Sequence, residues 1–237
     1  MTMSLKNTVV LIAGGSGALG QTVTPRFAQS GARVITADRN PLPEQVAAGN
    51  AMKIDVTDEA AVRRLVDDVI RTAGRLDVLI NLVGGFAMGR VVDTEMSLWQ
   101  RMLTMNVTSA FLLSKAVLPH MMERGTGRIL HVAAWAAVEP FPGAAAYLVA
   151  KSSLLALIRV LALELKGSGV TVNGVLPTTI DTPTNRASMP EANPSFWARP
   201  ESVAETLHFL ASDAAGQISG AAVPVGTGSG AMAAGKP

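Results

Sequence analysis

The chain has 237 residues, of which 49% are hydrophobic and 16% are charged. This composition excludes a disordered chain, which lacks the apolar surface needed to offset the entropy lost on ordering, and the length suits one large domain. The sequence contains no cysteine, which excludes disulfides and cysteine-ligated zinc. The formal net charge is only +2 and no basic block stands out, so we expect no nucleic-acid partner.

The N-terminal residues are polar and run directly into a short apolar segment, unlike a secretory signal peptide. The most apolar long stretch, residues 154–165, is shorter than a membrane span and contains Arg159 and Glu164. We therefore expect a cytoplasmic protein with no membrane segment.

Short apolar segments alternate with helical patterns along the chain. The predicted elements, in chain order, are strand 9–13, helix 21–30, strand 33–37, strand 52–55, helix 57–72, strand 77–80, helix 97–124, strand 128–132, helix 147–166, strand 170–176, helix 201–212 and strand 222–225. Thr57 is the expected N-cap of its helix, and Pro119 is expected to kink or shorten helix 97–124. Residues 177–200 have no clear period and are predicted as a loop or lid.

Strands that alternate with helices indicate βαβ units. The predicted fold class is therefore α/β, with a Rossmann-type doubly wound parallel sheet of about seven strands and helices on both faces. Residues 154–165 are apolar on most sides, which suits burial on both sides of that helix.

A glycine-rich loop follows the first predicted strand and opens a helix. Gly15, Gly17 and Gly20 fit the pattern G-x-G-x-x-G. Glycines let a backbone approach a pyrophosphate, whose charge the helix N-terminus favours. Asp38 ends the second predicted strand, where a carboxylate can accept the hydroxyls of an adenosine ribose. The combination favours a dinucleotide site over an ordinary glycine-rich turn.

The choice of dinucleotide is a question of charge. Asp38 would repel a 2′-phosphate and therefore favours NAD. Arg39 follows it directly and offers that phosphate a partner, so NADP remains the alternative.

Tyr147 is the only tyrosine, and Lys151 lies one helical turn after it on the same face. A phenol is a weak acid, with a pKa of about 10. An ammonium ~4 Å away stabilises the phenolate by on the order of 4 kcal/mol at an effective dielectric of ~20, which lowers the phenol pKa by up to ~3 units. The pair predicts general acid–base catalysis by a tyrosine of lowered pKa. The alternative is an amphipathic helix that carries both residues without chemistry.

Taken in order, these motifs resemble the short-chain dehydrogenase/reductase superfamily over nearly the whole chain. The matching segments are 13–20, Asp38, 55–56, 81–84, Asn106, Tyr147 with Lys151, and 177–182. The resemblance implies that Tyr147 exchanges a proton with the substrate, that Lys151 holds the nicotinamide ribose and lowers the tyrosine pKa, and that Asn106 positions a water in a proton relay. One dinucleotide-binding domain over residues 1–237 is then expected, with a substrate lid at about 178–199.

The resemblance also implies which residues bind the cofactor and the substrate. The expected cofactor-binding residues are Gly14, Ser16, Ala18, Leu19, Gly20, Asp38, Arg39, Asp55, Val56, Asn81, Val83, Tyr147, Lys151, Pro177, Ile180 and Thr182. Ala134, Trp135, Phe141 and Trp197 fall in segments that line substrate pockets in relatives, although simple packing would explain the aromatic residues equally well. A homo-oligomer, either a tetramer or a dimer, is implied as well.

One departure from the family pattern is chemical. Thirteen residues before the tyrosine, relatives carry a serine that donates a hydrogen bond to the substrate oxygen, and this chain has Ala134. Dihydropteridine reductases also carry alanine there and a Gly-Gly-x-Gly-Ala-Leu-Gly loop, which residues 14–20 reproduce. The expected function is an NAD(P)-dependent oxidoreductase for a small carbonyl or alcohol. The alternatives are reduction of a quinonoid C=N substrate and a catalytically impaired cofactor-binding protein.

The three histidines have no ligand spacing, so no metal site is expected. His131 lies on the strand that leads to Ala134, and we interpret it as a packed strand residue rather than a ligand.

Overall fold

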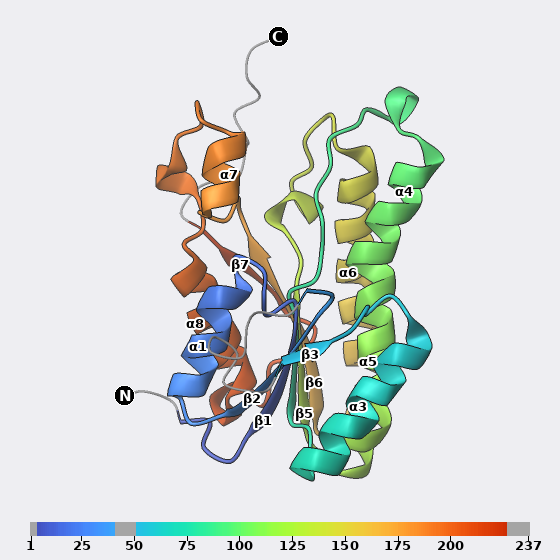
Figure 1. Cartoon of the computed structure of the whole chain (residues 1–237), viewed down its shortest axis with the longest axis vertical. Coiled ribbons are helices and arrows are strands. Elements are labelled where there is room, and N and C mark those ends of the chain that lie inside the picture. The colour runs from blue at the N-terminus through green and yellow to red at the C-terminus, as the bar shows by residue number, and fades with distance from the viewer. Residues whose placement is uncertain (1–3, 41–50, 227–237) are drawn as a thin grey trace.

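The computed structural model describes residues 4–40 and 51–226 and has a seven-stranded parallel sheet as its centre (Figure 1). The order of the strands in the sheet is β3-β2-β1-β4-β5-β6-β7. The strands are β1 (Val9–Ala13), β2 (Arg33–Asp38), β3 (Ala51–Lys53), β4 (Val78–Asn81), β5 (Gly127–Val132), β6 (Val170–Pro177) and β7 (Ala222–Val225). The order reverses between β1 and β4, so the carboxyl ends of these two strands flank a crevice where ligands bind in such sheets.

Helices cover both faces of the sheet (Figure 1). One face carries α1 (Gly20–Gln29) and α8 (Pro200–Ala211), and the other carries α3 (Glu59–Ala73), α5 (Ser109–Glu123) and α6 (Ala145–Glu164). The predicted doubly wound α/β class is therefore confirmed, with the predicted number of strands.

Each face of the sheet has its own hydrophobic core. Leu11, Leu79 and Ile129 pack with the helices α3, α5 and α6, whereas Val10 and Ile12 pack with α1 and α8. Successive side chains of a strand point to opposite faces, and both faces are covered here. This explains why the strands are continuous apolar runs rather than alternating ones.

Two local expectations need correction, the N-cap of α3 and the place at which helix 97–124 is interrupted. The N-cap of α3 is Asp58, whose carboxylate accepts from the Ala61 N–H at 3.1 Å, while Thr57 bonds instead to Asp55. Helix α5 continues through Pro119 to Glu123. The interruption lies upstream, where α4 (Met96–Leu103) passes into α5 through a π-helical turn, η2 (Thr104–Thr108).

The segment expected to be irregular, residues 177–200, contains structure of its own. It holds the short helix α7 (Pro183–Ser188), capped by Thr182, and a 3₁₀ turn, η4 (Pro194–Phe196). Proline occupies the first turn of each, where a missing N–H costs nothing. These elements are too short to leave a periodic signal in the sequence.

Two helical stretches, Met96–Glu123 and Ala145–Glu164, are long and apolar enough by length and composition to cross a membrane, and core helices pass the same test. Both pack on the sheet and on each other. Within the described residues of this single chain, the stretch 154–165 is buried on one side only. Val160 is half exposed and Leu163 is 74% exposed, because α6 covers the sheet with one side only.

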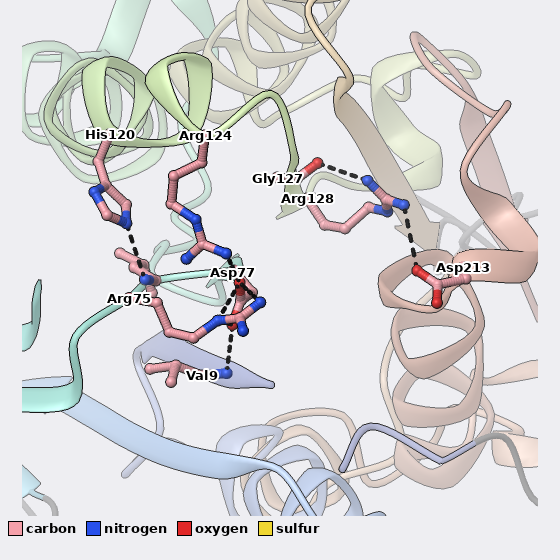
Figure 2. A network of polar contacts seen from close by, with 9 residues as sticks. Val9, Arg75, Asp77, His120, Arg124, Gly127, Arg128 and Asp213 are labelled. Atoms are coloured by element: carbon pink, nitrogen blue, oxygen red, sulfur yellow. Dashed lines mark hydrogen bonds and ion pairs between the residues drawn. The ribbon is translucent and has the colours of Figure 1, made fainter. Parts of the chain in front are cut away.

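At the amino ends of the strands, Asp77 joins three parts of the chain (Figure 2). Its carboxylate accepts from the backbone N–H of Val9 at 2.8 Å and from Arg75 at 2.7 to 2.9 Å, and it pairs with Arg124 of the α5 C-terminus at 3.3 Å. The Asp77 side chain is only 12% exposed, so these bonds are poorly replaced by water.

We expect Asp77→Ala to lower the free energy of unfolding by about 2 kcal/mol, since it leaves a strand N–H and two guanidinium groups without their acceptor. Urea unfolding measures the change. The control is Asp213→Ala, because Asp213 is fully exposed at 3.8 Å from Arg128 and should contribute almost nothing. Equal effects of the two substitutions would contradict the role assigned to Asp77.

Candidate active site

A cleft opens at the carboxyl ends of β1, β2 and β4 and encloses about 280 Å³. The residues that line it come from five separate segments of the sequence. They are Gly14, Ser16, Gly17, Ala37, Asp38, Arg39, Asn40, Ile54, Asp55, Val56, Thr57, Leu82, Val83, Gly84 and Met105.

The glycine-rich loop forms one wall of this cleft and leads into α1. Gly14 has a φ of +86°, and a Cβ there would lie 3.0 Å from the backbone nitrogen of Val83. A Cβ on Gly20 would overlap the carbonyl oxygens of Gly14 and Gly15. The loop therefore needs glycine both for its conformation and for its contact with the helix start. The N-terminus of α1, which begins at Gly20, completes a site suited to an anion.

Asp38 lies against the glycine-rich loop and lines the cleft beside it. One of its carboxylate oxygens accepts from the Ser16 N–H at 2.8 Å. Partial burial raises the Asp38 pKa above its usual value, and the bonds from Ser16 and Gly15 oppose this effect. The group still places a carboxylate at the end of β2, as the sequence predicts.

Asp55 and Val56 line another part of the cleft, just after β3. The Asp55 carboxylate accepts from the N–H of Thr57 at 2.9 Å and from its hydroxyl at 2.7 Å, and these bonds lower its pKa. The turn after β4 forms another wall of the cleft. There the Asn81 side-chain oxygen accepts from the Val83 N–H at 3.0 Å. Asn81 is buried and supports the cleft from behind rather than lining it.

Two polar side chains meet at Gly84, beside this turn. A Cβ on Gly84 would lie 2.7 Å from Asn106 Oδ1 and 3.2 Å from Lys151 Nζ. Asn106 is fully buried in the π-helical turn. Its amide donates to the Gly85 carbonyl at 3.1 Å and to the Met102 carbonyl at 2.9 Å, and its Oδ1 accepts from the Gly85 N–H at 3.2 Å.

Lys151 is buried, and its ammonium donates to the Val132 carbonyl at 3.0 Å. Burial lowers the Lys151 pKa to about 8. Tyr147 lies one turn earlier on α6 and is largely enclosed. The Phe86 ring meets the Tyr147 ring edge to face, with 4.9 Å between centroids and 80° between planes.

The comparisons with known proteins agree with this geometry. The family model described as enoyl-(acyl carrier protein) reductase matches residues 14–229. The chain is 34% identical to meso-2,3-butanediol dehydrogenase of Serratia marcescens, covering 95% of this chain and 96% of that one. It is also 34% identical to dehydrogenase/reductase SDR family member 4 of Bos taurus, covering 95% and 88% respectively. Among solved structures, the aldohexose dehydrogenase of Thermoplasma acidophilum superposes with a TM-score of 0.87 at 26% identity, covering 94% of each chain.

The chain belongs to the short-chain dehydrogenase/reductase superfamily. It is therefore an NAD(P)-dependent enzyme that binds a small-molecule substrate.

Only some of the residues in the short-chain dehydrogenase/reductase motifs line the cleft. Of the residues predicted to bind cofactor, those that line the cleft are Gly14, Ser16, Asp38, Arg39, Asp55, Val56 and Val83. Those outside the lining are Ala18, Leu19, Gly20, Asn81, Tyr147, Lys151, Pro177, Ile180 and Thr182. The cleft is also lined by residues that were not among the predicted cofactor-binding residues, namely Gly17, Ala37, Asn40, Ile54, Thr57, Leu82, Gly84 and Met105. Met105 carries no motif signal, because the π-helical turn brings it to the cleft.

The proposed lid segment is closed at its base. The Ala198 N–H donates to the Thr179 carbonyl at 2.8 Å, and the Asp181 N–H donates back to the Ala198 carbonyl at 2.9 Å. Thr182 bonds within the segment, where its hydroxyl accepts from the Asn185 N–H at 3.2 Å. The segment is thus a compact loop with its own internal bonds.

The four predicted substrate residues differ in their burial and in their contacts. Ala134 is buried at the end of β5 in extended backbone. The Trp135 indole donates to Glu139 at 3.0 Å and packs against the core beneath α6, which favours the packing interpretation. Phe141 and Trp197 are partly exposed and form no ring contact within the described residues. Phe86, which sequence reasoning missed, is the aromatic residue placed against Tyr147.

The expectation that Lys151 lowers the Tyr147 pKa is contradicted. Burial raises the pKa of Tyr147 to about 12. The physical reason is that the ammonium is itself buried and directed to the Val132 carbonyl, so desolvation of the phenolate dominates.

The cleft fits a nicotinamide dinucleotide. The glycine positions keep the wall free of Cβ atoms, the start of α1 suits a pyrophosphate, and Asp38 suits ribose hydroxyls. No cluster of metal-ligating side chains occurs in the described part of the chain.

We expect the phenol of the folded protein to titrate near 12, well above the value of 10.0 for a free phenol. As the pH rises above 10, the phenol of the unfolded chain loses its proton, whereas the phenol of the folded chain keeps it until the pH approaches 12. Stability due to Tyr147 is therefore complete below pH 10 and falls as the pH rises toward 12. Because Tyr147 is the only tyrosine, phenolate absorbance of folded and urea-unfolded protein reports the difference directly.

Tyr147→Phe is the control, since it must remove the absorbance change completely. A folded-state midpoint at or below that of the unfolded chain would contradict the dominant role of burial.

Proposed function

We propose that the protein transfers hydride between a nicotinamide cofactor and a small carbonyl or alcohol substrate, with Tyr147 as the general acid and base. The observation that carries this proposal is the meeting of Lys151 Nζ and Asn106 Oδ1 at Gly84, beside the cofactor cleft and one helical turn from Tyr147. A bound nicotinamide dinucleotide supplies or accepts the hydride, and the protein residues bind, orient and move protons.

We assign the chain's residues the following roles. The loop from Gly14 to Gly20 holds the pyrophosphate, and Asp38 holds the adenosine ribose. Lys151 holds the nicotinamide ribose, and Tyr147 donates its proton to the carbonyl oxygen in the reducing direction. The raised pKa of Tyr147 suits this donation, because the phenol stays protonated at neutral pH. Asn106 keeps the π-helical turn in place through its bonds to Met102 and Gly85.

A second candidate substrate is a quinonoid C=N compound. Two observations favour it. Ala134 provides no hydroxyl at the position of the usual oxyanion donor, and a half-exposed Phe86 beside Tyr147 offers an apolar face to a planar ring. An electron-poor quinonoid accepts hydride without that donor, whereas a simple ketone benefits from it.

We further propose that residues 178–199 act as a substrate lid and that the protein is a homo-oligomer, a dimer or a tetramer. Exposed apolar side chains on α5 and α6 support the oligomer, namely Phe111, Val149, Val160 and Leu163.

The function is tested with NADH and NADPH against ketones, quinones and quinonoid dihydropterin. Wild-type protein should turn over at least one class, and Tyr147→Phe should abolish that turnover. We expect Ala134→Ser to raise ketone turnover by up to ~10²-fold, because it restores one oxyanion donor, and to change quinonoid turnover little.

Ala133→Ser is the matched control, since Ala133 points into the core against α5 and α6 rather than to the site. If Tyr147→Phe kept full activity, the proposed proton transfer would have to be abandoned. Turnover of quinonoid substrate alone would favour the second candidate.

We expect Asp38 to set a preference for NAD. Asp38→Asn keeps an acceptor for the Ser16 N–H but removes the charge that repels a 2′-phosphate, so NADP binding should improve at least about tenfold relative to NAD. Calorimetry of both cofactors measures the ratio. Glu59→Gln removes an exposed carboxylate outside the cleft and should leave the ratio unchanged. An unaltered ratio in Asp38→Asn would exclude this role.

A further inference from the structure

His131 is a buried titratable residue that the mechanism above does not use. It lies on β5, where it is paired with Asn81 of β4 and with Gly174 of β6, and it is completely buried. Its ring nitrogens face two polar side chains. Nδ1 lies 3.4 Å from Asn81 Nδ2, and Nε2 lies 3.0 Å from the Ser114 hydroxyl of α5.

The direction of these bonds follows from which groups can only donate. The Val83 N–H is a donor, so the Asn81 atom that faces it must be the carbonyl oxygen. The Asn81 amide nitrogen then faces His131 and can only donate, which makes Nδ1 the acceptor. The proton of a neutral ring therefore sits on Nε2 and points to Ser114. A single tautomer satisfies the whole chain of bonds.

The imidazole is held in its neutral form by its surroundings. Burial and the nearby Lys151 ammonium lower the His131 pKa to about 3. The groups bonded to the ring, Asn81 and Ser114, are uncharged, so no carboxylate offsets these two effects. The tautomer is thus fixed throughout the neutral pH range.

We propose that His131 is a positioning residue that fixes the Asn81 amide and, through it, the turn formed by Leu82, Val83 and Gly84. This turn is a wall of the cofactor cleft. The next residue on β5, Val132, holds the Lys151 ammonium through its carbonyl. One short segment of β5 thus sets both the cofactor wall and the lysine, and His131 serves cofactor affinity rather than proton transfer.

This inference rests on the proposed function, because it assigns the cleft to the dinucleotide. The test compares the binding of NADH and NADPH to wild-type protein and to His131→Leu, which keeps an apolar bulk but neither bond. We expect about tenfold weaker binding, since the Asn81 amide loses its partner inside the core. The KM for cofactor should rise while kcat at saturating cofactor changes little.

His131→Gln is the rescue variant, because its amide offers both an acceptor and a donor, and it should recover most of the affinity. His120→Leu is the matched control. His120 accepts from the Leu76 N–H at 3.3 Å at the opposite end of the sheet, so its loss should lower stability without weakening cofactor binding (Figure 2). Ser114→Ala removes the other partner of the ring without altering the strand, and weaker cofactor binding is expected there too.

Nitrogen-15 spectra of labelled histidine test the bonds assigned to the ring, while the split between KM and kcat separates a role in cofactor binding from a merely structural one. His131 should show the Nε2–H tautomer without titration between about pH 5 and pH 8, and Asn81→Ala should shift its Nδ1 resonance. A titrating or Nδ1–H ring, or unchanged affinity in both His131→Leu and Ser114→Ala, overturns the proposal. If wild-type protein binds neither cofactor, the proposed function fails, and the role of His131 in cofactor binding fails with it. Wild-type binding with no loss in the variants rejects His131 alone.

Discussion

The missing side chain of Gly84 is the constraint on which the arrangement of the site depends. Gly84 lies in the turn after β4, and both the π-helical turn before α5 and helix α6 approach it. A Cβ there would press on Asn106 Oδ1 and Lys151 Nζ. Because Gly84 leaves that space, the amide of Asn106 can hold Gly85 by two bonds. Lys151 can at the same time reach the Val132 carbonyl from the other side. The three elements thus pack closely around Gly84, beside the cleft.

Burial of polar groups has a cost, and here it also tunes the chemistry. Lys151 and Tyr147 are both desolvated, which lowers the lysine pKa to about 8 and raises the phenol pKa to about 12. Both shifts favour the neutral form. A phenol that stays protonated is suited to donate a proton to a developing alkoxide. A lysine whose pKa is near neutral changes its protonation readily when a charge is brought close to it.

Two apolar residues bear on the proposed substrate site. Ala134 is buried just after β5, and Phe86 meets the Tyr147 ring edge to face while remaining half exposed. The loop that carries Phe86 is anchored on both sides. Gly85 is held by Asn106, and Gly89 bonds to Gly143 and Ala145 just before and at the start of α6. This rigidity supports the view that Phe86 shapes the substrate site.

The sequence by itself determined the order of the elements, the sheet class and the position of the glycine-rich loop at the cleft. These features depend on local patterns, because apolar runs, glycine clusters and the Tyr147–Lys151 spacing are set within a few residues of the chain. It also placed Asp38 and Asp55 at the cleft, since parallel strands end at a common edge. Only the tertiary structure decided the direction of the Tyr147 pKa, the position of Phe86 and the bonds of His131. Those depend on desolvation and on contacts between residues tens of positions apart, and no local pattern in the chain encodes them.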